Sequence, residues 1–378
     1  MKTATTLFVV CVGALLSLGL VMLYSAGIRP SAAQGARYLI SQLEWCGLGL
    51  LVCLVASWMD YRWLKKFAWV LLGLAVIALV LVLIPGIGMV KNGARRWFNL
   101  GIGSFQPSEV AKLALIIALA AYADRNQRVM GTFKRGLLVP GIFMSVVLGL
   151  IFVEPDRGTT VLLAAVCGIM LLIAGVKWRH LAPGMGIAAC GLAASLWFDP
   201  VRRGRILSWL DPEHHKDFIH QNLQARLALG AGGWTGMGLG NGRQKMGFVP
   251  EHQTDFILSV IGEELGVVAT LAIVLLFLAL VICGVFIAWN SKNTFGTLLG
   301  SGITFLIGLQ ALINIGVVTE VFPNKGLPLP FISYGGSNLL LMFTCVGVIL
   351  SIARHARDPA VIEAEHLPSN EALAPQNP

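Results

Sequence analysis

The sequence predicts an all-α polytopic membrane protein with about ten transmembrane helices. Hydrophobic residues make up 56% of the 378 residues, whereas charged residues make up only 12%. The apolar runs repeatedly reach the length of about 20 residues that a helix needs to cross a bilayer. In chain order, the predicted spans are residues 5–25, 37–58, 64–84, 107–123, 137–153, 158–175, 181–198, 256–288, 297–318 and 334–353.

The distribution of basic residues predicts the orientation. The net charge is +9, and the basic residues lie in short loops between the spans, more of them on the side that carries both termini. Because positively charged loops stay in the cytoplasm, both termini are predicted to be cytoplasmic and the large loop between helices 7 and 8 extracytoplasmic. This dispersed charge argues against a nucleic-acid-binding protein. The seven cysteines all fall inside apolar spans, which indicates small apolar side chains rather than disulfides or metal ligands.

Most loops are short, and three outer segments are long: residues 85–106, 199–255 and 319–333. Long ordered loops on a rigid scaffold often carry the chemistry of a protein. Residues 199–255 are therefore predicted to be the outer catalytic loop of one transmembrane domain, residues 1–357. Within the loop, the spacing of apolar residues over 218–229 predicts an amphipathic helix on the membrane surface. The acidic, proline-containing segment 358–378 is predicted to be a disordered cytoplasmic tail.

Two opposite charges open the fourth span. Glu109 and Lys112 follow Pro107 and are three residues apart, which places both on one face of a helix. One interpretation is that they anchor the helix by reaching back to water. The other is that they line a polar cavity, because ionisable groups at this depth are costly and usually functional.

Asp255 lies where the long polar loop meets the eighth span. Its carboxylate is either the amino-terminal cap of that helix, a role for which Thr254 competes, or a catalytic base. Glu263 and Glu264 follow two turns further in, and their cost in an apolar setting predicts a polar cavity at the outer end of the helix.

Two outer clusters of basic residues run against the orientation rule. One is Lys91–Trp97, which includes Arg96, and the other is the run Arg202, Arg203 and Arg205. Positive charge at this boundary suits either a phosphate-bearing lipid headgroup or anionic lipids in general.

Other polar residues have simpler interpretations. Gln310 and Asn314, four residues apart in the ninth span, are expected to form interhelical hydrogen bonds. The glycine-rich segment 230–242 indicates turns and close backbone approaches rather than a nucleotide site, because no strand precedes it. Four histidines share the outer loop without the spacing of a metal site: His214, His215, His220 and His252.

Six ordered segments resemble the SEDS family of bacterial cell-wall polymerases, the group that contains FtsW, RodA and SpoVE. The segments are Gly93–Trp97, Phe105–Glu109, Glu154–Thr159, Leu239–Ile257, Gly262–Gly266 and Leu329–Ser337. The similarity runs from the first span to about Arg354. It implies a peptidoglycan glycosyltransferase that joins lipid II units into glycan strands on the outer face of the bacterial cytoplasmic membrane.

Within this family, residues 244–251 and 322–328 are more similar to the division branch (FtsW) than to the elongation branch (RodA), so septal synthesis is expected. Three alternatives stay open: an elongation-type polymerase, a flippase that carries lipid II across the membrane, and a scaffold that recruits a transpeptidase. The charged residues cluster at the outer boundary, whereas a transporter needs them near the middle of the membrane. This placement favours the polymerase over the flippase.

The resemblance assigns catalysis to Asp255, as the base that accepts the proton of the acceptor hydroxyl. Substrate-binding roles are predicted for Lys112, Glu109, Arg96, Arg203, Arg205, Lys245 and Ser333. The cations are expected to stabilise the departing undecaprenyl pyrophosphate, with Glu109 orienting Lys112. A divalent cation, Mg²⁺ or Mn²⁺, is compatible with this chemistry, although the sequence shows no dedicated metal site.

The implied partners are lipid II, the growing lipid-linked glycan strand, membrane lipids, a class B penicillin-binding transpeptidase and other membrane proteins of the divisome. The chain also departs from the family pattern. Gln253 stands where the family usually has histidine, with His252 displaced by one position, and Arg157 replaces an apolar residue. Asn222 and Arg226 are polar where apolar residues are common.

Overall fold

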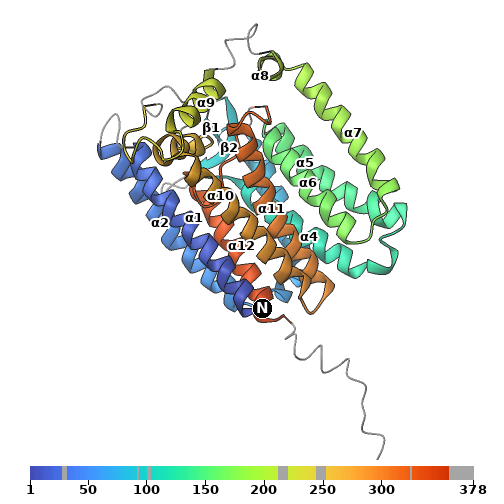
Figure 1. The fold of residues 1–378 in the computed structure, drawn as a ribbon. Helices are drawn as coiled ribbons and strands as arrows, with labels where there is room; N and C mark the ends of the chain where they lie inside the picture. The colour runs from blue at the N-terminus through green and yellow to red at the C-terminus, as the bar shows by residue number, and fades with distance from the viewer. Residues whose placement is uncertain are drawn as a thin grey trace, which may run out of the picture.

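The computed structural model describes residues 1–27, 32–91, 93–99, 104–211, 220–243, 253–323 and 326–356, and most of them form a bundle of long helices (Figure 1). The helices at the predicted spans are α1 (Lys2–Gly27), α2 (Ala32–Trp58), α3 (Arg62–Leu83), α4 (Pro107–Arg125), α5 (Val139–Val153), α6 (Arg157–Ile173), α7 (Trp178–Trp197), α10 (Ile257–Trp289), α11 (Thr294–Val318) and α12 (Gly336–Arg354). Two short helical turns connect α4 to α5: η1 (Gln127–Val129) and the π-helical η2 (Lys134–Leu138).

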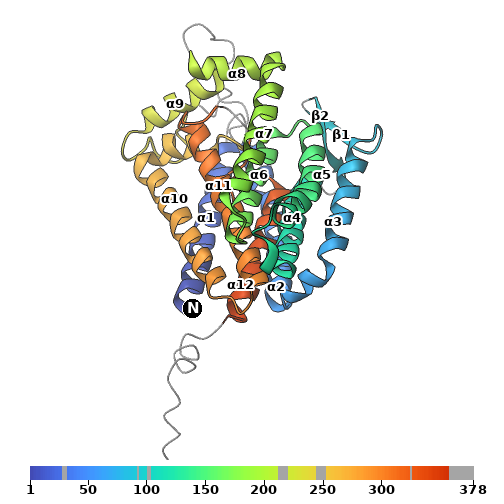
Figure 2. The same ribbon diagram turned by 90° about the vertical axis from the view of Figure 1, so that its right-hand side faces the viewer.

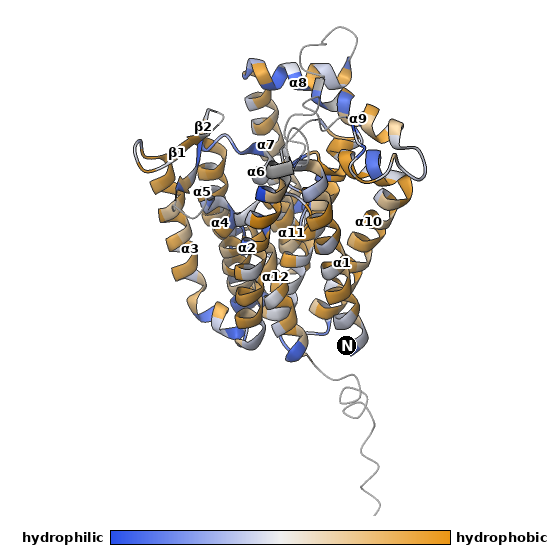
Figure 3. Ribbon diagram, turned by 90° about the vertical axis from the view of Figure 1, so that its left-hand side faces the viewer, coloured by the Kyte–Doolittle hydropathy of each residue, from blue (hydrophilic) through white to orange (hydrophobic). Residues whose placement is uncertain are grey.

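Hydropathy identifies most of these helices as membrane spans. Eight of the described helices are long and apolar enough to cross a membrane. The other two are α6, with 17 residues, and α4, whose 19 residues include Glu109 and Lys112. Apolar residues dominate the helices between the two ends of the bundle (Figure 3). The all-α polytopic class is therefore confirmed, whereas the count of ten spans stays a prediction.

The bundle is centred on α11, α12 and the buried α4, while α7 lies at the periphery (Figures 1 and 2). Small residues allow the helices to approach closely. A Cβ atom added to Gly347 of α12 would lie 2.5 Å from the backbone oxygen of Cys53 of α2. Close packing of this kind is what holds helices together in a membrane, because lipid tails are as apolar as the side chains they replace.

The start of α1 and the end of α12 lie at the same end of the bundle, and β1, β2, α8 and α9 lie at the opposite end (Figure 2). We name these the inner and outer ends, following the predicted orientation. The described helices end at Arg354. The predicted tail, 358–378, lies outside the described residues, so the division into domain and tail stays a prediction.

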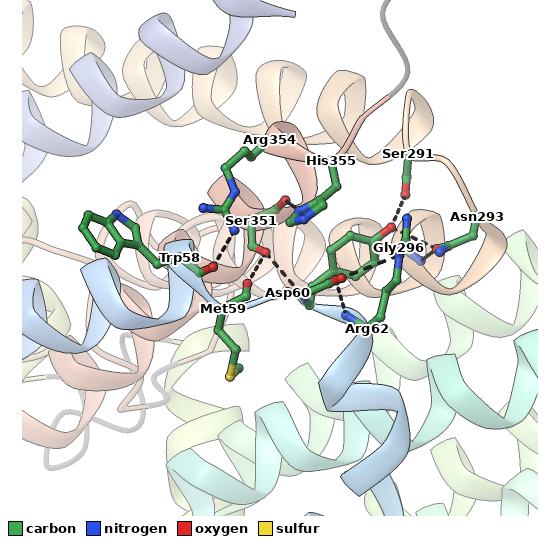
Figure 4. Close-up of polar contacts among 11 residues, drawn as sticks. Trp58, Met59, Asp60, Arg62, Ser291, Asn293, Gly296, Ser351, Arg354 and His355 are labelled. Carbon is green, nitrogen blue, oxygen red and sulfur yellow. Dashed lines mark hydrogen bonds and ion pairs between the residues drawn. The ribbon is translucent and has the colours of Figure 1, made fainter.

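At the inner end, Met59, Ser351 and Asn293 come from three different segments (Figure 4), and a buried tyrosine joins these segments. Tyr61, whose exposed fraction is 1%, follows α2, and its hydroxyl donates to Oδ1 of Asn293 between α10 and α11 (3.2 Å). Its backbone N–H donates to Oγ of Ser351 on α12 (3.2 Å), and that hydroxyl donates to the backbone oxygen of Met59. The inner end is therefore closed by hydrogen bonds between α2, α12 and the α10–α11 turn.

The outer segment 85–106 folds into a small antiparallel sheet that the sequence analysis did not predict. Its strands are β1 (Met89–Lys91), β2 (Ala94–Asn99) and β3 (Ser104–Phe105), in the order β1-β2-β3. Val90 pairs with Arg95, and Phe98 pairs with Phe105. β1 and β3 are too short for a period of two to be visible in the sequence, and β2 shows no alternation of buried and exposed residues.

The described part of the loop 199–255 forms two helices, α8 (Pro200–Leu210) and α9 (His220–Gly232). The carboxylate of Asp199 caps α8 by accepting from the backbone N–H of Arg202 (3.3 Å). The predicted amphipathic helix corresponds to α9, which packs against α10 with Ala225 and Ala228 fully buried. Its apolar face therefore covers α10, and its position on a membrane surface stays a prediction.

Candidate active site

The Glu109–Lys112 pair lies inside the bundle. The Nζ of Lys112 is 2.9 Å from Oε2 of Glu109, and the two side chains are 1% and 6% exposed. Pro107 starts α4 at the outer end, so both charges fall in its first two turns. Neither side chain reaches back to water, which rules out the anchoring interpretation. Because an unpaired charge is costly here, each residue depends on the other.

Gln310 on α11 connects this pair to neighbouring segments. The Nζ of Lys112 donates to Oε1 of Gln310 (3.2 Å). The amide nitrogen of Gln310 donates in turn to the backbone oxygen of Pro328 (2.9 Å) and to Oδ1 of Asn338 on α12 (3.0 Å). The expected interhelical bonding is confirmed, and it joins α4, α11, α12 and the segment before α12.

Asn314, one turn further along α11, holds the segment of Asp255. Its amide nitrogen donates to the backbone oxygens of Asp255 (2.8 Å) and Leu327 (2.7 Å). A Cβ atom on Gly326 would lie 2.5 Å from Oδ2 of Asp255, so glycine leaves room for the carboxylate. Gln310 and Asn314 form a polar row on α11 that links the Lys112 pair to Asp255.

The capping interpretation of Asp255 is not supported by the helix start. α10 begins at Ile257, Phe256 occupies the N-cap position, and no side-chain capping hydrogen bond is formed there. Neither Asp255 nor Thr254 is at the position where a cap would act. The catalytic role of Asp255 stays a prediction.

Ser333 fixes the same segment from the other side. Its hydroxyl donates to the backbone oxygen of Thr254 (2.6 Å) and accepts from the backbone N–H of Leu329 (2.8 Å), and the residue is 2% exposed. The backbone N–H of Tyr334 also donates to the backbone oxygen of Gln253 (2.9 Å). These bonds give Ser333 a positioning role beside Asp255, whereas its predicted contact with substrate stays untested.

Glu263 and Glu264 bind the glycine-rich segment. Oε1 of Glu263 accepts from the backbone N–H of Arg243 (2.7 Å), and Oε2 of Glu264 accepts from the backbone N–H of Gly240 (3.0 Å). The hydroxyl of Ser25 on α1 also donates to Glu264. Both glutamates are buried. These N–H and O–H groups provide part of the polar environment expected around the two glutamates, and the cavity itself stays a prediction.

The same glycine-rich segment enters a break in α10. Gly266 has φ +78° and ψ −175°, which interrupts the helix, and the backbone N–H of Val267 donates to the backbone oxygen of Gly233 instead (2.9 Å). A Cβ atom on Gly266 would lie 2.4 Å from the backbone oxygen of Trp234 and 2.5 Å from the nitrogen of Gly236. Backbone meets backbone here, which is why glycine is required.

The predicted outer arginines separate into two groups. Arg96 is half-buried, and its Nε and Nη2 donate to the backbone oxygens of Glu154 (2.7 Å) and Pro155 (2.8 Å). Arg203 and Arg205 are exposed, and the Arg203 guanidinium lies 5.9 Å from the Trp197 ring centroid. Lys245, the remaining predicted substrate contact, lies outside the described residues.

Three functional candidates were not predicted, namely Glu154, Asp156 and Arg157, and Arg202 was predicted only as part of the outer arginine run. Asp156 caps α6 by accepting from the backbone N–H (3.1 Å) and hydroxyl (3.0 Å) of Thr159. Glu154 is fully buried, and neither of its carboxylate oxygens has a hydrogen-bond partner. Burial, reinforced by the charge of Asp156, raises the pKa of Glu154 to about 8. The segment Glu154–Thr159 had been noted, but only the fold shows that Glu154 is buried.

This raised pKa predicts how the stability depends on pH. The folded protein holds the Glu154 proton up to about pH 8, whereas the unfolded chain releases it above its ordinary pKa of about 4.3. The free energy of unfolding is therefore highest below about pH 4.3 and falls as the pH rises to about 8. Glu154→Gln should therefore change the thermal midpoint little at pH 5. At pH 8.5 it should raise the midpoint, because it increases the free energy of unfolding by about a few kcal/mol. Thermal unfolding in detergent at both pH values checks this. An equal shift at both would contradict it.

Two of the departures from the family pattern have structural partners. Arg226 on α9 forms an ion pair with Glu320, which follows α11 (3.2 Å). Arg157 donates to the backbone oxygen of Ser195 near the end of α7 (2.8 Å). Both residues therefore tie parts of the outer end together, which explains why a polar side chain is accommodated at each position.

Metal binding is not settled by the described side chains. Among these residues, no group of three or more His, Cys, Asp or Glu could hold a metal ion. The side chains of the four outer histidines lie outside them. The expectations of no metal site and of an assisting Mg²⁺ or Mn²⁺ both stay predictions.

The fold and site define a polytopic helical membrane protein whose charged and polar groups gather near the outer end, where β1–β3, α8 and α9 form what we name the outer cap. The family model FtsW/RodA/SpoVE, described as a cell cycle protein, matches residues 5–358. The chain therefore belongs to this family, as the resemblance implied, and it is a multi-pass protein of the bacterial inner membrane.

Individual relatives agree with this membership. The chain is 42% identical over 345 residues to a probable peptidoglycan glycosyltransferase FtsW of Trichlorobacter lovleyi, covering 90% of each chain. It is 38% identical to stage V sporulation protein E of Bacillus subtilis, covering 94% of this chain and 99% of the relative.

Solved structures show the same fold. A chain from a peptidoglycan synthase complex that coordinates polymerization and crosslinking is 30% identical, with a TM-score of 0.77 and coverage of 92% and 96%. The rod shape determining protein RodA of Thermus thermophilus is 28% identical, with a TM-score of 0.70 and coverage of 93% and 97%.

Proposed function

We propose that this protein is a peptidoglycan glycosyltransferase that polymerises lipid II on the outer face of the cytoplasmic membrane, for septal synthesis during division. The observation that carries the proposal is the placement of Asp255. Its segment is held at the outer end by Asn314 and Ser333, and the polar row on α11 continues from it to the buried Lys112 pair. The relatives named FtsW support the activity and the division branch.

The chemistry requires one base and stabilisation of one leaving group. The β-1,4 link is made from an α-linked donor, so the acceptor oxygen attacks the anomeric carbon as the bond to the pyrophosphate breaks. Asp255 accepts the hydroxyl proton, which is worth about 10²–10⁴ in rate. The undecaprenyl pyrophosphate departs with the electron pair, and cations stabilise its charge.

Lys112 acts on the leaving group from within the bundle. Its side chain is 1% exposed and contacts Glu109 and Gln310. A direct bond to pyrophosphate would require the protein to open, so we propose that Lys112 acts indirectly, by holding Gln310 and with it the polar row. The exposed Arg203 and Arg205 remain candidates for direct contact with the substrate, as does Lys245.

The partner is proposed to be a class B penicillin-binding transpeptidase of the divisome. The support is the structural similarity to a chain of a complex in which polymerization and crosslinking are coordinated. A strand made at the outer end by this protein would then be crosslinked beside it.

The flippase alternative is less well supported. Polar and charged groups gather at the outer end, whereas the inner end is closed around Tyr61. A polar headgroup crossing the bundle along this side would have to break those hydrogen bonds.

The test is direct. Purified protein, alone and with the transpeptidase, is incubated with labelled lipid II, and the products are separated by gel electrophoresis. Glycan polymer is expected. The absence of polymer, together with lipid II transport by the protein in liposomes, would establish the flippase function instead.

A further inference from the structure

Three arginines converge on the turn between α5 and α6. Arg96 of β2 donates to the backbone oxygens of Glu154 (2.7 Å) and Pro155 (2.8 Å). Nη2 of Arg202, on α8, donates to the same Pro155 oxygen (3.1 Å). Arg157, which opens α6, extends to the α7–α8 corner. We name Arg96, Arg157 and Arg202 the outer arginine cluster.

The positive charge of this cluster is poorly balanced. Asp199 is the acid paired with it among the described residues, 3.7 Å from Nη2 of Arg157 and 3.3 Å from Nε of Arg202. Glu154 is nearby but fully buried, and burial raises its pKa to about 8, so it is mostly neutral at pH 7. Burial and the charge of Arg157 also lower the pKa of Arg202. Three guanidinium groups therefore lie near the carboxylates of Asp199 and Asp156, which leaves one positive charge in excess.

Two guanidinium nitrogens in the cluster have no acceptor. Nε of Arg157 and Nη1 of Arg202 are buried and lack hydrogen-bond partners. Buried N–H groups are nearly always paired, so such orphans need an explanation. A negatively charged ligand with several acceptor oxygens would satisfy both nitrogens and the excess charge, and a phosphate matches the planar guanidinium best.

The cluster lies close to the proposed catalytic segment. A Cβ atom on Gly158, next to Arg157, would be 3.3 Å from the side chain of Leu327. The backbone oxygen of Leu327 binds the amide of Asn314, which also binds the backbone of Asp255. The backbone next to Arg157 therefore packs against the segment that Asn314 joins to Asp255.

We propose that Arg157 and Arg202, with Arg96, form a binding site for the phosphate groups of a polyprenyl pyrophosphate. The choice of ligand rests on the proposed function, while the anion site rests on the geometry of the arginines. Arg157 stands where the family usually has an apolar residue, so this part of the site is a feature of this chain and not of the usual family pattern.

A purely structural latch is the competing explanation, because Asp199 bridges Arg157 and Arg202. Asp199→Asn separates the two. Asparagine still caps α8, but it removes the negative charge that competes with a ligand. If the cluster is an anion site, this variant should bind the ligand at least as tightly as the wild type. If the cluster is only a structural latch, losing the Asp199 charge should loosen the arginines and weaken any binding.

The experiment measures binding of radiolabelled farnesyl pyrophosphate to the purified full chain in detergent. Arg157→Gln and Arg202→Gln should each weaken binding at least tenfold, and Asp199→Asn should not weaken it. Arg37→Gln, which removes an exposed positive charge at the start of α2, is the matched control and should bind as the wild type does. If a glutamine variant fails to fold, the corresponding lysine variant retains the charge, and it should bind with intermediate affinity.

Competitors identify what is recognised. Inorganic pyrophosphate should displace the probe and farnesol should not, because the guanidinium groups bind the phosphates and not the prenyl chain. Displacement by farnesol alone, wild-type affinity of both glutamine variants, or loss of binding in Asp199→Asn would overturn the proposal. Polymer formation by a protein with such results would leave the proposed function intact, whereas arginine-dependent binding without polymerisation would leave only the anion site.

Discussion

Asp255→Asn is expected to abolish glycan polymerisation while leaving the protein folded. The amide cannot accept the proton of the acceptor hydroxyl, so the rate should fall about 10²–10⁴-fold. Folding should persist because Asn314 holds the backbone oxygen of Asp255 rather than its side chain. The measurement is polymer formed from labelled lipid II by the purified variant, together with its thermal midpoint.

Asp60→Asn provides the control, because it makes the same chemical change at a partly exposed acid of the inner end, whose ion pair with Arg62 is loose (3.9 Å). Its activity should equal that of the wild type. Near-normal polymer from Asp255→Asn would refute the assignment of the base. Unchanged transport of lipid II by the same variant, in a protein that makes no polymer, would support the flippase.

Changes to Glu109 and Lys112 should separate stability from activity. Because both side chains are buried and paired, Lys112→Met strands a carboxylate and Glu109→Gln strands an ammonium, and each single change should cost about 3–5 kcal/mol of stability. The double variant Glu109→Gln/Lys112→Met leaves no unpaired charge. It should recover most of the stability but not polymerisation, since Gln310 loses the ammonium that donates to it and the polar row on α11 is no longer fixed.

Thermal unfolding and the lipid II assay on the three variants measure both effects. The control is the ion pair of Lys65 and Asp124 at the inner end, in which Lys65 is exposed and Asp124 is partly buried. Neutralising both should change stability by no more than about 1 kcal/mol and leave activity intact. Recovery of both stability and activity in the Glu109/Lys112 double variant would show that the buried pair is structural only.

Hydropathy was sufficient to predict the helices, because a bilayer imposes length and apolar composition on every span. It was not sufficient for the outer elements. The strands β1 to β3 have three, six and two residues, and their pairing depends on contacts between segments rather than on a local pattern. The helix at α9 was predictable from spacing, but its packing against α10 was not.

Contacts within the site were predictable where the partners are close together in the sequence. Three-residue spacing placed Glu109 and Lys112 on one face, and the structure pairs them. The direction in which an arginine of the outer run points was not predictable, because all three follow one another on a short helix. Arg202 turns inward and Arg203 outward. Interhelical bonding of Gln310 and Asn314 was expected, yet their bonds to two distant segments depend on the tertiary fold.

The break at Gly266 affects how deep Asp255 lies in bilayers of different thickness. A spanning helix tilts when lipid chains lengthen or shorten. Asp255 precedes the short outer piece of α10, and the inner piece begins at Val267, whose N–H bonds to Gly233 instead of continuing the helix. Tilting of the inner piece can therefore be absorbed at the break, and the depth of Asp255 should follow the outer cap. Polymerisation in liposomes should then vary little with acyl-chain length, and a steep dependence would show that α10 moves as one rod.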